Sequence, residues 1–352
     1  MRYDVTVLGA GIFGLATAWA CAARGAKVQV IDPNGIGAGS SGGVVGALAP
    51  HVPEQWNAKK QFQFEALDGA AVFWAGVADA ANLPSGYARV GRVQPIMDQA
   101  GLDLARARQS GAKTHWQGRY IWDIRPAADY APWITSPTAQ VIFDSLSARL
   151  APRQGLVALA AALRAKGGQI VSDAPLMGAV VEATGAAGLA ELSDAFGVAV
   201  GAGQKGQAAI LDADMGSLPQ LFIDGVHFVP HEGPQGRGQV AIGSTSERDF
   251  NDPSSTDANL DFLIEKARSL CPALAKAQVV TRWAGLRPRA KSRAPMLGRH
   301  PLRTDHFIAN GGFKIGFGIA PRVADVMADL VLEGRDTIPS DFAPAVSLPA
   351  QA

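Results

Sequence analysis

A run of basic side chains near the C-terminal end of the sequence is suited to binding an anion. The stretch RWAGLRPRAKSR, residues 282–293, has no acidic residue and contains Arg282, Arg287, Arg289, Lys291 and Arg293. Three interpretations are open: a nucleic-acid contact, a solvated loop, or a frame around one arginine with a chemical role. A phosphate-binding patch needs clustered positive charge interleaved with aromatic residues. Only Trp283 interleaves here, and 32 Lys plus Arg face 31 Asp plus Glu in the whole chain, so we expect no nucleic-acid partner.

The N-terminal segment has the residue types that bind a dinucleotide. Gly9, Gly11 and Gly14 follow the G-x-G-x-x-G spacing between a β-rich run at 5–8 and a helix predicted over 12–24. The first glycine allows a tight turn, the second lets the backbone approach a pyrophosphate, and the third lets the helix pack on the strand. The helix N-terminus supplies amide donors to the phosphates. This pattern leaves NAD and FAD unseparated.

An acidic residue and a second glycine-rich segment support this interpretation. Asp32 ends a second predicted strand, 21 residues after Gly11, where an acid binds ribose hydroxyls. Residues 35–54 are too rich in glycine for a regular element and too apolar for a plain linker. Ser40 and Ser41 can donate to phosphate there, and the glycines allow backbone contact with a planar ring. A flexible surface loop is the alternative.

Length and composition indicate an ordinary globular protein with one large or two interleaved domains. The chain has 352 residues, of which 48% are hydrophobic and 18% charged. The first strand begins by Asp4, which leaves no room for a signal peptide, and no uncharged apolar run is long enough to span a bilayer. We therefore expect a cytoplasmic protein without a transmembrane segment. Cys21 and Cys271 are too few and too distant for a disulfide framework or a metal cluster, so we expect buried thiols and no metal.

The elements that position these residues alternate between strand and helix at both ends of the chain. The pattern predicts further helices over 57–80, 152–166, 256–270 and 320–332, the last with Pro321 in its first turn. Residues 82–145 have scattered Pro, Trp and Tyr and are predicted to form an irregular cap. Short β segments over 206–250 predict an antiparallel sheet.

Six segments together resemble the FAD-dependent D-amino-acid oxidase family, and within it the glycine oxidase and sarcosine oxidase-like branch. They are VLGAGIFGLATAW, GSSGGVVGALAP, VVEATGAAG, GVHFVP with VAIGSTSE, WAGLRPRAKSRAPMLGRHP and GGFKIGFGIAP, and they extend from residue 4 to about 335. The resemblance implies an α/β fold in two parts. A discontinuous Rossmann-type FAD-binding domain would take residues 1–80, 146–205 and 285–352. An antiparallel-sheet substrate domain would take 81–145 and 206–284.

The resemblance also implies which residues bind FAD. They are Gly9, Gly11, Ile12, Gly14 and Asp32 for the ADP half, Ser40, Ser41, Gly46, Ala47 and Leu48 for the phosphates and ring, Leu176 for adenine, and Thr184, Gly185, Arg287, Gly312, Lys314, Ile315, Gly316, Phe317 and Gly318 around the cofactor. Sarcosine oxidase-like members often attach flavin through a C-terminal cysteine. No cysteine follows Cys271, so we expect noncovalent FAD. Only fifteen residues separate Gly168 from Thr184, where relatives insert a β hairpin that should be trimmed here.

Four side chains are predicted to act on the substrate. Arg287 is the arginine of the family's GLRP motif, which would bind a carboxylate through two parallel charge-assisted hydrogen bonds. Lys314 aligns with a second basic residue near the carboxylate. His51 and His227 are candidates to accept the proton of a substrate ammonium, with a structural role as the alternative for each. His227 stands where glycine oxidase-type relatives have a tyrosine, which leaves glycine as the substrate in doubt.

The predicted activity is oxidation of the C–N bond of a small amino acid or secondary amine to an imine. The substrate would be of the glycine, sarcosine or D-amino-acid type, with hydride transfer to flavin N5. Two alternatives are kept: the oxidase half of a tRNA wobble-uridine modifying enzyme, and a flavin-binding protein without turnover. The sequence leaves open the particular amine, its stereochemistry, the electron acceptor and the oligomeric state.

Overall fold

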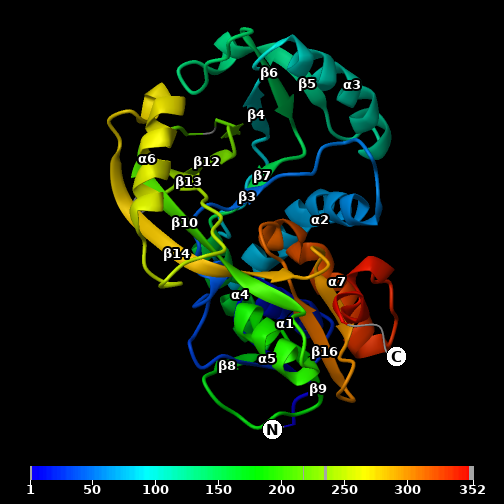
Figure 1. The fold of residues 1–352 in the computed structure, drawn as a ribbon. Helices are drawn as coiled ribbons and strands as arrows, with labels where there is room; N and C mark the ends of the chain where they lie inside the picture. The colour runs from blue at the N-terminus through cyan, green and yellow to red at the C-terminus, as the bar shows by residue number, and fades with distance from the viewer. Residues whose placement is uncertain (1, 217, 234–235, 349–352) are drawn as a thin grey trace.

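The apolar runs at the two ends of the chain meet in one six-stranded sheet in the computed structural model, which describes residues 2–216, 218–233 and 236–348 (Figure 1). In order across the sheet, its strands are β15 (Met296–Arg299), β16 (His306–Asn310), β9 (Ala179–Glu182), β1 (Val5–Leu8), β2 (Val28–Ile31) and β8 (Gln169–Val171). All neighbours are parallel except β15, which pairs antiparallel with β16. Helices cover both faces of such a sheet, which explains why β1 and β2 are almost continuously apolar.

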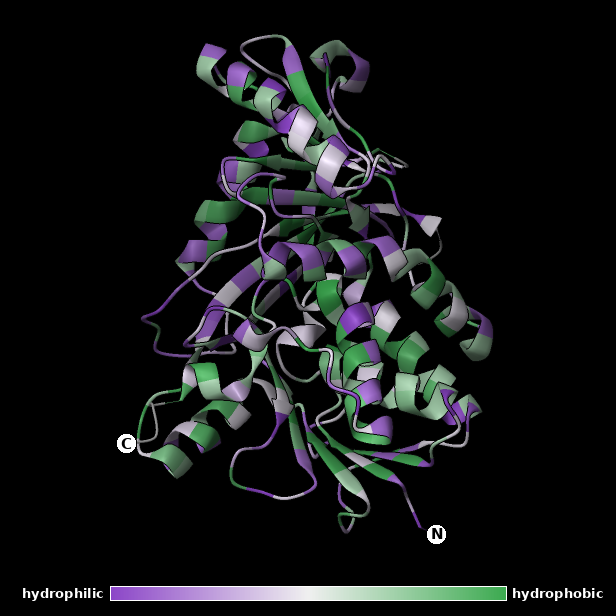
Figure 2. Cartoon of the chain, turned by 90° about the vertical axis from the view of Figure 1, so that its right-hand side faces the viewer, coloured by the Kyte–Doolittle hydropathy of each residue, from purple (hydrophilic) through white to green (hydrophobic). Residues whose placement is uncertain are grey.

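Five helices pack around this sheet. They are α1 (Ile12–Ala23), α2 (Ala58–Ala81), α4 (Pro152–Ala165), α5 (Gly185–Phe196) and α7 (Gly316–Glu333). The helix α1 packs against both α4 and α7, while α5 lies against the long strands of a second sheet. Because neighbours surround it, α1 is buried along nearly its whole length and carries little polar surface. In Figure 2 the strands at the bottom are mainly hydrophobic, whereas many helices carry both hydrophobic and hydrophilic residues.

The second sheet has eight strands and lies above the first in Figure 1. In order, its strands are β14 (Gln278–Ala290), β10 (Gly201–Asp212), β13 (Gly238–Gly243), β12 (Val226–Glu232), β11 (Gln220–Ile223), β4 (Arg92–Pro95), β6 (Gln140–Asp144) and β5 (Trp122–Pro126). The prediction of an antiparallel sheet holds for every pair but one. The strands β4 and β11 run parallel. The strand β4 comes from a distant part of the chain and pairs with the outer strand of the β11–β12 hairpin.

The two faces of this second sheet have different surroundings. The helix α6 (Ala258–Leu270) covers one face, where Leu211, Phe228 and Ile242 are fully buried. Since side chains alternate across a strand, the residues between these point to the opposite face. There, a Cβ at Gly243 would meet the side chain of Val45, so this face lies over the glycine-rich segment 35–54.

The prediction that residues 82–145 are irregular is wrong. Besides β4, β5 and β6, this stretch contains α3 (Gln99–His115), whose first turn is capped by the Asp98 carboxylate accepting from the Gly101 amide at 2.7 Å. Only Leu102, Ala105 and Ala112 of α3 are buried. So narrow an apolar face gives a weak helical period in the sequence.

The C-terminal helix begins one turn earlier than predicted. Helix α7 starts at Gly316, not at residue 320, and Pro321 lies inside it. Pro321 is the sixth residue of the helix, where its missing N–H removes one backbone hydrogen bond, and the helix continues through it. The earlier start moves the helix N-terminus into the glycine turn itself.

The remaining elements are short. They are β3 (Ala47–Leu48) paired with β7 (Ala148–Arg149), and the 3₁₀ helices 40–42, 127–130, 272–274, 340–342 and 344–347. The predicted domain boundaries at 205/206 and 284/285 fall inside β10 and β14, which therefore connect the two halves. The division into domains stays a prediction. Within the described ranges, no helix is long and apolar enough to cross a membrane. Cys21 and Cys271 are both buried free thiols, as expected.

Candidate active site

The N-terminal glycine turn packs tightly against the end of the neighbouring strand β9. At Gly9 the backbone has φ +103°, and a Cβ would lie 2.9 Å from the carbonyl carbon of Ala183 at the end of β9. A Cβ at Gly14 would overlap the Gly9 carbonyl oxygen and approach Val7 at 3.3 Å. These two positions need glycine for the turn and for close packing of α1 on β1. Gly11 is different, because only the Ser41 hydroxyl, at 3.1 Å, lies near its missing side chain.

The side chains of Asp32 and Ser41 are held at the mouth of this turn. The Asp32 carboxylate accepts from the amides of Ala10 and Asn34, at 2.7 and 2.9 Å. The Ser41 hydroxyl accepts from the Ile12 amide at 3.0 Å, at the first residue of α1. The acid and the hydroxyl thus lie at the carboxyl ends of the strands, where parallel sheets bind ligands.

A second glycine turn lies directly beside the first. A Cβ at Gly312 would lie 2.8 Å from the Phe13 ring, and one at Gly316 would lie 3.6 Å from the Ile12 side chain. The N-termini of α1 and α7 are therefore neighbours. Each end carries partial positive charge and amide donors that suit a phosphate or an anionic ring. This pair of helix ends, with the Gly11 opening and Asp32, supplies the donors, positive charge and acid that suit the phosphates and ribose of FAD.

The other predicted cofactor residues fall into two groups. Most of them gather near the paired helix ends: Ser40, Ala47 and Leu48 follow the first turn, Thr184 and Gly185 begin α5 at the end of β9, and Lys314, Ile315, Phe317 and Gly318 surround the start of α7. Gly46 has φ +67° and would overlap the Leu150 carbonyl if it carried a side chain. Leu176 is half-exposed in the connection between β8 and β9, which has no hairpin. Its neighbours Pro175 and Met177 are bonded to Gln29 and Thr6 in the middle of the sheet.

Arg287 is a buried cation without an acidic partner. Its side chain lies on β14 with 7% of the residue exposed, and one guanidinium nitrogen donates to the Thr245 carbonyl at 3.1 Å. Among the described residues no carboxylate lies within ion-pair distance of it. Burial lowers the pKa of Arg287 to about 10, opposed by the charge of Glu247. The guanidinium therefore stays ionised near neutral pH and keeps donors for a ligand.

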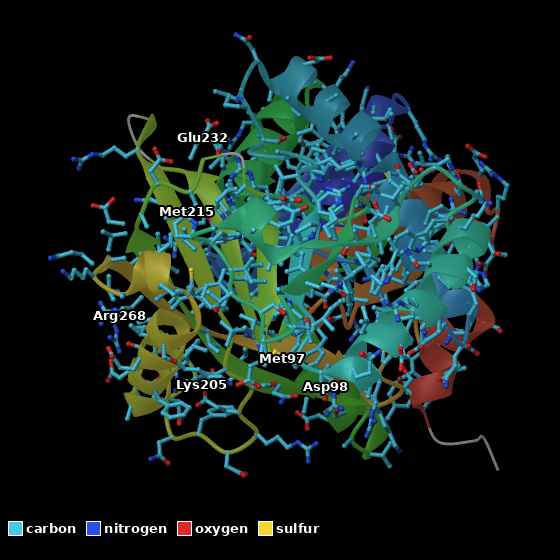
Figure 3. All side chains as sticks on the ribbon, turned by 90° about the horizontal axis from the view of Figure 1, so that it is seen from above. Met97, Asp98, Lys205, Met215, Glu232 and Arg268 are labelled. Carbon is cyan, nitrogen blue, oxygen red and sulfur yellow. The ribbon has the colours of Figure 1, made fainter. Side chains whose placement is uncertain are left out.

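The neighbouring Lys205 shows what a satisfied buried cation looks like in this protein. It lies on β10, labelled in Figure 3, and its side chain points to the α6 side of the sheet. The ammonium bonds the Asp257 carboxylate at 2.8 Å, at the first turn of α6. That bond, with hydrogen bonds from the Gln207 side chain and the Asn259 amide, lowers the pKa of Asp257 to about 2. Lys205 is thus a structural ion pair, whereas Arg287 on the other face lacks one.

His51 lines a cavity of about 220 Å³ with the second glycine turn. The cavity is bounded by His51, Lys59, Arg293, Pro295, Gly311, Gly312, Phe313, Lys314 and Ile315. The Gln63 amide oxygen accepts from the His51 backbone amide at 2.7 Å and also contacts its Nδ1, while the Gln63 amide nitrogen donates to the Ala49 carbonyl. This arrangement places the proton on Nδ1 and leaves Nε2 as an acceptor. Burial lowers the pKa of His51, so the ring is neutral near pH 7.

His227 faces the same side of the second sheet as Arg287. Its ring lies 4.5 Å from the Phe222 ring, and its buried Nδ1 has no partner within the described structure. Burial first, then the charges of Arg92 and Lys314, lower the pKa of His227 to about 3. His227 is therefore neutral, and the positive charges of Arg92 and Lys314 both act on its ring.

Lys314 is close enough to Arg287 for the two charges to interact. Partial burial lowers the pKa of Lys314, and the charges of Arg287 and Arg289 lower it further. Its ammonium lies 5.6 Å from the Phe313 ring, and more than a third of the residue stays exposed to solvent. The predicted substrate residues Arg287, Lys314, His51 and His227 thus surround one region.

Sequence reasoning missed two residues of this region, Arg92 and Gln63. Arg92 is 6% exposed on β4, and its Nε bonds the fully buried Asp144 carboxylate at 2.9 Å. Its charge acts on both His51 and His227. The sequence offered one signal for Arg92, namely that a charged residue stands beside Val93 in a predominantly apolar segment. Gln63, 2% exposed on α2, gave none, because its role depends on the loop folded against it.

The other basic residues of the stretch 282–293 have separate surroundings. Arg282 pairs with Asp261 at 2.8 Å, and Arg289 lies over the Phe313 ring at 5.5 Å. Lys291 and Arg293 are exposed, although Arg293 also borders the cavity beside His51.

A larger cavity, of about 940 Å³, lies away from these residues. It opens between α2, the start of α4 and the ends of β12 and β13, with Trp74, Tyr87, Arg149 and His231 in its wall. None of the predicted site residues lines this larger cavity.

Comparisons with known proteins address the family and the fold. The glycine oxidase of Bacillus licheniformis is 25% identical over 94% of this chain and 93% of its own length. The glycine oxidase of Geobacillus kaustophilus is 24% identical over 97% of this chain and 96% of its own. The crystal structure of the latter enzyme superimposes with a TM-score of 0.81 at 21% identity, covering 100% and 99% of the two chains. These matches confirm the expected family and the α/β fold. Residues 4–330 match the family described as FAD dependent oxidoreductase, and the chain belongs to that family.

Proposed function

We propose that this oxidoreductase oxidises the C–N bond of a small amino acid or secondary amine to an imine. The relatives named glycine oxidase support an amino-acid-like substrate. When bound, FAD supplies the hydride acceptor. The residues of this chain then bind the substrate carboxylate, hold the amine carbon toward the cofactor and accept the ammonium proton.

The observation that carries the proposal is the unpaired Arg287. An ionised guanidinium is costly to bury unless a partner compensates it. Within the described residues Arg287 has one backbone carbonyl and no carboxylate. A substrate carboxylate would supply the missing charge through a two-pronged hydrogen bond.

His51 is the better placed of the two histidines to act as a base. Its Nδ1 is engaged by Gln63, which leaves Nε2 to accept a proton from a ligand in the cavity that it shares with Lys314. His227, with a pKa near 3, is too weak a base for that role near pH 7 and is proposed to form the wall.

We propose that FAD is held without a covalent bond and that the enzyme works in the cytoplasm. Cys21 lies within α1, and the Cys271 thiol donates to the Trp133 carbonyl at 3.3 Å. Burial raises the pKa of Cys21 to about 12 and that of Cys271 to about 11. Neither thiol is available as the thiolate that attachment needs.

Arg287→Ala and Arg287→Lys test the function. With FAD retained, Arg287→Ala should raise the substrate concentration needed for anaerobic flavin bleaching roughly tenfold to more than a hundredfold, because a charge-assisted pair contributes about 1.5–3 kcal/mol. Arg287→Lys should recover part of this, since lysine offers one point charge instead of a fork. Arg282→Ala is the matched control, because its guanidinium already pairs with Asp261.

The two alternative functions give different results in the same preparation. A tRNA gel shift would support the wobble-uridine enzyme, and bound flavin that no amine bleaches would support a protein without turnover. An Arg287→Ala variant that titrates like the parent would show that the arginine is structural.

A further inference from the structure

The pairing register of the second sheet places two arginines on one face, at opposite sides of the site. Arg287 on β14 pairs with Gln204 on β10, and Ala208 of β10 pairs with Gly243 of β13. Gly243 pairs with His227, His227 with Phe222, and Gln220, two residues from Phe222, pairs with Arg92. The residues that alternate with these, such as Val93 and Phe228, are packed in the core under α6.

The floor between the two arginines is made of small residues. Gly206, Ala208 and Gly243 occupy it on β10 and β13. Beyond them His227 and Phe222 form a neutral aromatic pair, and Lys314 approaches from the α7 turn. Five strand-to-strand steps of about 4.8 Å put the Arg287 and Arg92 backbones roughly 24 Å apart along the sheet, a gap that both long side chains narrow. Both arginines therefore lie over one face of the sheet, with small residues and a neutral aromatic pair between their strands.

Arg92 keeps hydrogen-bonding capacity for a ligand. Its Nε is used by Asp144, but its two terminal nitrogens have no hydrogen-bond partner within the described structure. Asp144 itself is fixed from the other side, because it accepts from the Ser147 amide at 2.8 Å. The guanidinium also lies 6.0 Å from the Phe222 ring. Asp144 is thus a positioning residue that orients the Arg92 fork.

Taken with the proposed function, on which this inference rests, the geometry points to a substrate with two carboxylates. One carboxylate binds Arg287 beside the amine carbon, and a distal carboxylate on the other arm of the amine binds Arg92. The substrate class is therefore an N-(carboxyalkyl) amino acid in which two acidic groups flank a secondary amine. Lys314 lies close enough to Arg287 and His227 for its charge to act on both, and it adds positive charge for the dianion.

Matched ligand pairs test this without turnover. Oxydiacetate and its homologues with two or three methylenes before the second carboxylate are ether analogues that cannot be oxidised at nitrogen. Each is paired with the alkoxyacetate in which a methyl group replaces that carboxylate, such as ethoxyacetate for oxydiacetate. Binding to the oxidised holoenzyme is measured by calorimetry and by the flavin absorbance change. At one of the lengths, we expect the diacid to bind at least roughly tenfold more tightly than its partner.

Variants locate the second anchor. Arg92→Gln should bring the affinity ratio of the best pair close to one, and Arg92→Lys should keep part of it. Because Arg92→Gln leaves Asp144 buried without its cation, the double variant Arg92→Leu/Asp144→Leu is measured as well, with Arg282→Ala as the control. Equal affinities within every pair in the parent would overturn the inference. A preference for diacids that survives both Arg92 variants would overturn the assignment to Arg92.

Flavin reduction separates this inference from the function beneath it. Iminodiacetate and N-(2-carboxyethyl)glycine are compared with N-ethylglycine and N-propylglycine under anaerobic conditions. Bleaching by both members of a pair at equal concentrations supports the amine oxidation and contradicts the dicarboxylate class. Absence of bleaching by any amine contradicts the proposed function, while the ether titrations still decide whether Arg92 binds a second carboxylate.

Discussion

Replacing Gly206 with alanine should displace the Arg287 guanidinium without removing its charge. A Cβ at Gly206 would overlap Cζ and both terminal nitrogens of Arg287, which cross the neighbouring strand at this point. The clashing atoms are the end of a flexible side chain, so the guanidinium moves and the backbone stays. Alanine also suits a strand better than glycine. We therefore expect little loss of folding stability and a clear loss of substrate binding.

The size of the effect follows from the hydrogen bonds that are lost. A displaced guanidinium no longer presents two parallel donors to the carboxylate, which removes about 1.5–3 kcal/mol. That corresponds to a roughly tenfold to more than hundredfold higher substrate concentration for half-maximal flavin bleaching. The bond from Arg287 to the Thr245 carbonyl should be lost as well.

Stopped-flow bleaching and thermal unfolding together make the assay. Gly69→Ala is the matched control, because Gly69 lies in α2 with nothing within 4 Å of its missing side chain. It should leave substrate binding as in the parent and stabilise the helix slightly. A Gly206→Ala enzyme with full flavin content and parental titration would refute the placement of Arg287 at the carboxylate.

Three further predictions concern the cofactor and the fold. Gly11→Val should abolish FAD binding, because its side chain would enter the opening left beside Ser41; full flavin content after purification would contradict this. Acid precipitation should release the flavin to the supernatant, and flavin that stays in the pellet would contradict noncovalent binding. Stability should fall between pH 6.5 and 3, because the unfolded chain binds a proton that native His227 refuses. The loss is about 1.4 kcal/mol per pH unit for each such histidine, so urea titrations of His227→Phe should show a shallower decline than the parent.

The sequence was sufficient for the parts of the fold that depend on local chemistry. The turn at Gly9, the packing of Gly14 and the acid at Asp32 follow from steric and electrostatic requirements that the spacing of the residues expresses. Burial of Cys21 followed in the same way from its place in an apolar helix.

The features that the sequence did not predict depend on tertiary contacts. Helix α3 buries so few residues that its period is masked, and the start of α7 depends on how Gly316 packs against Ile12. Arg92 could not be joined to Arg287 from the sequence, because their relation depends on the register of five strand pairings. Gln63 became visible only when the loop at His51 folded against α2.

The histidines of the site predict how the reaction depends on pH. Burial lowers the pKa of His51 and takes that of His227 to about 3, so both rings are neutral above their ordinary value of 6.5. The positive charge of the site then rests on Arg287, Arg92 and Lys314. Because burial lowers the pKa of His51, any inflection that its protonation causes in the rate of flavin reduction should lie below pH 6.5. Above that value, the rate should rise with pH only as the substrate ammonium ionises. Anaerobic stopped-flow measurements from pH 5.5 to 9 test this, and an inflection near 6.5 that disappears in His51→Gln would show that the His51 ring is protonated below it and that burial has not lowered its pKa.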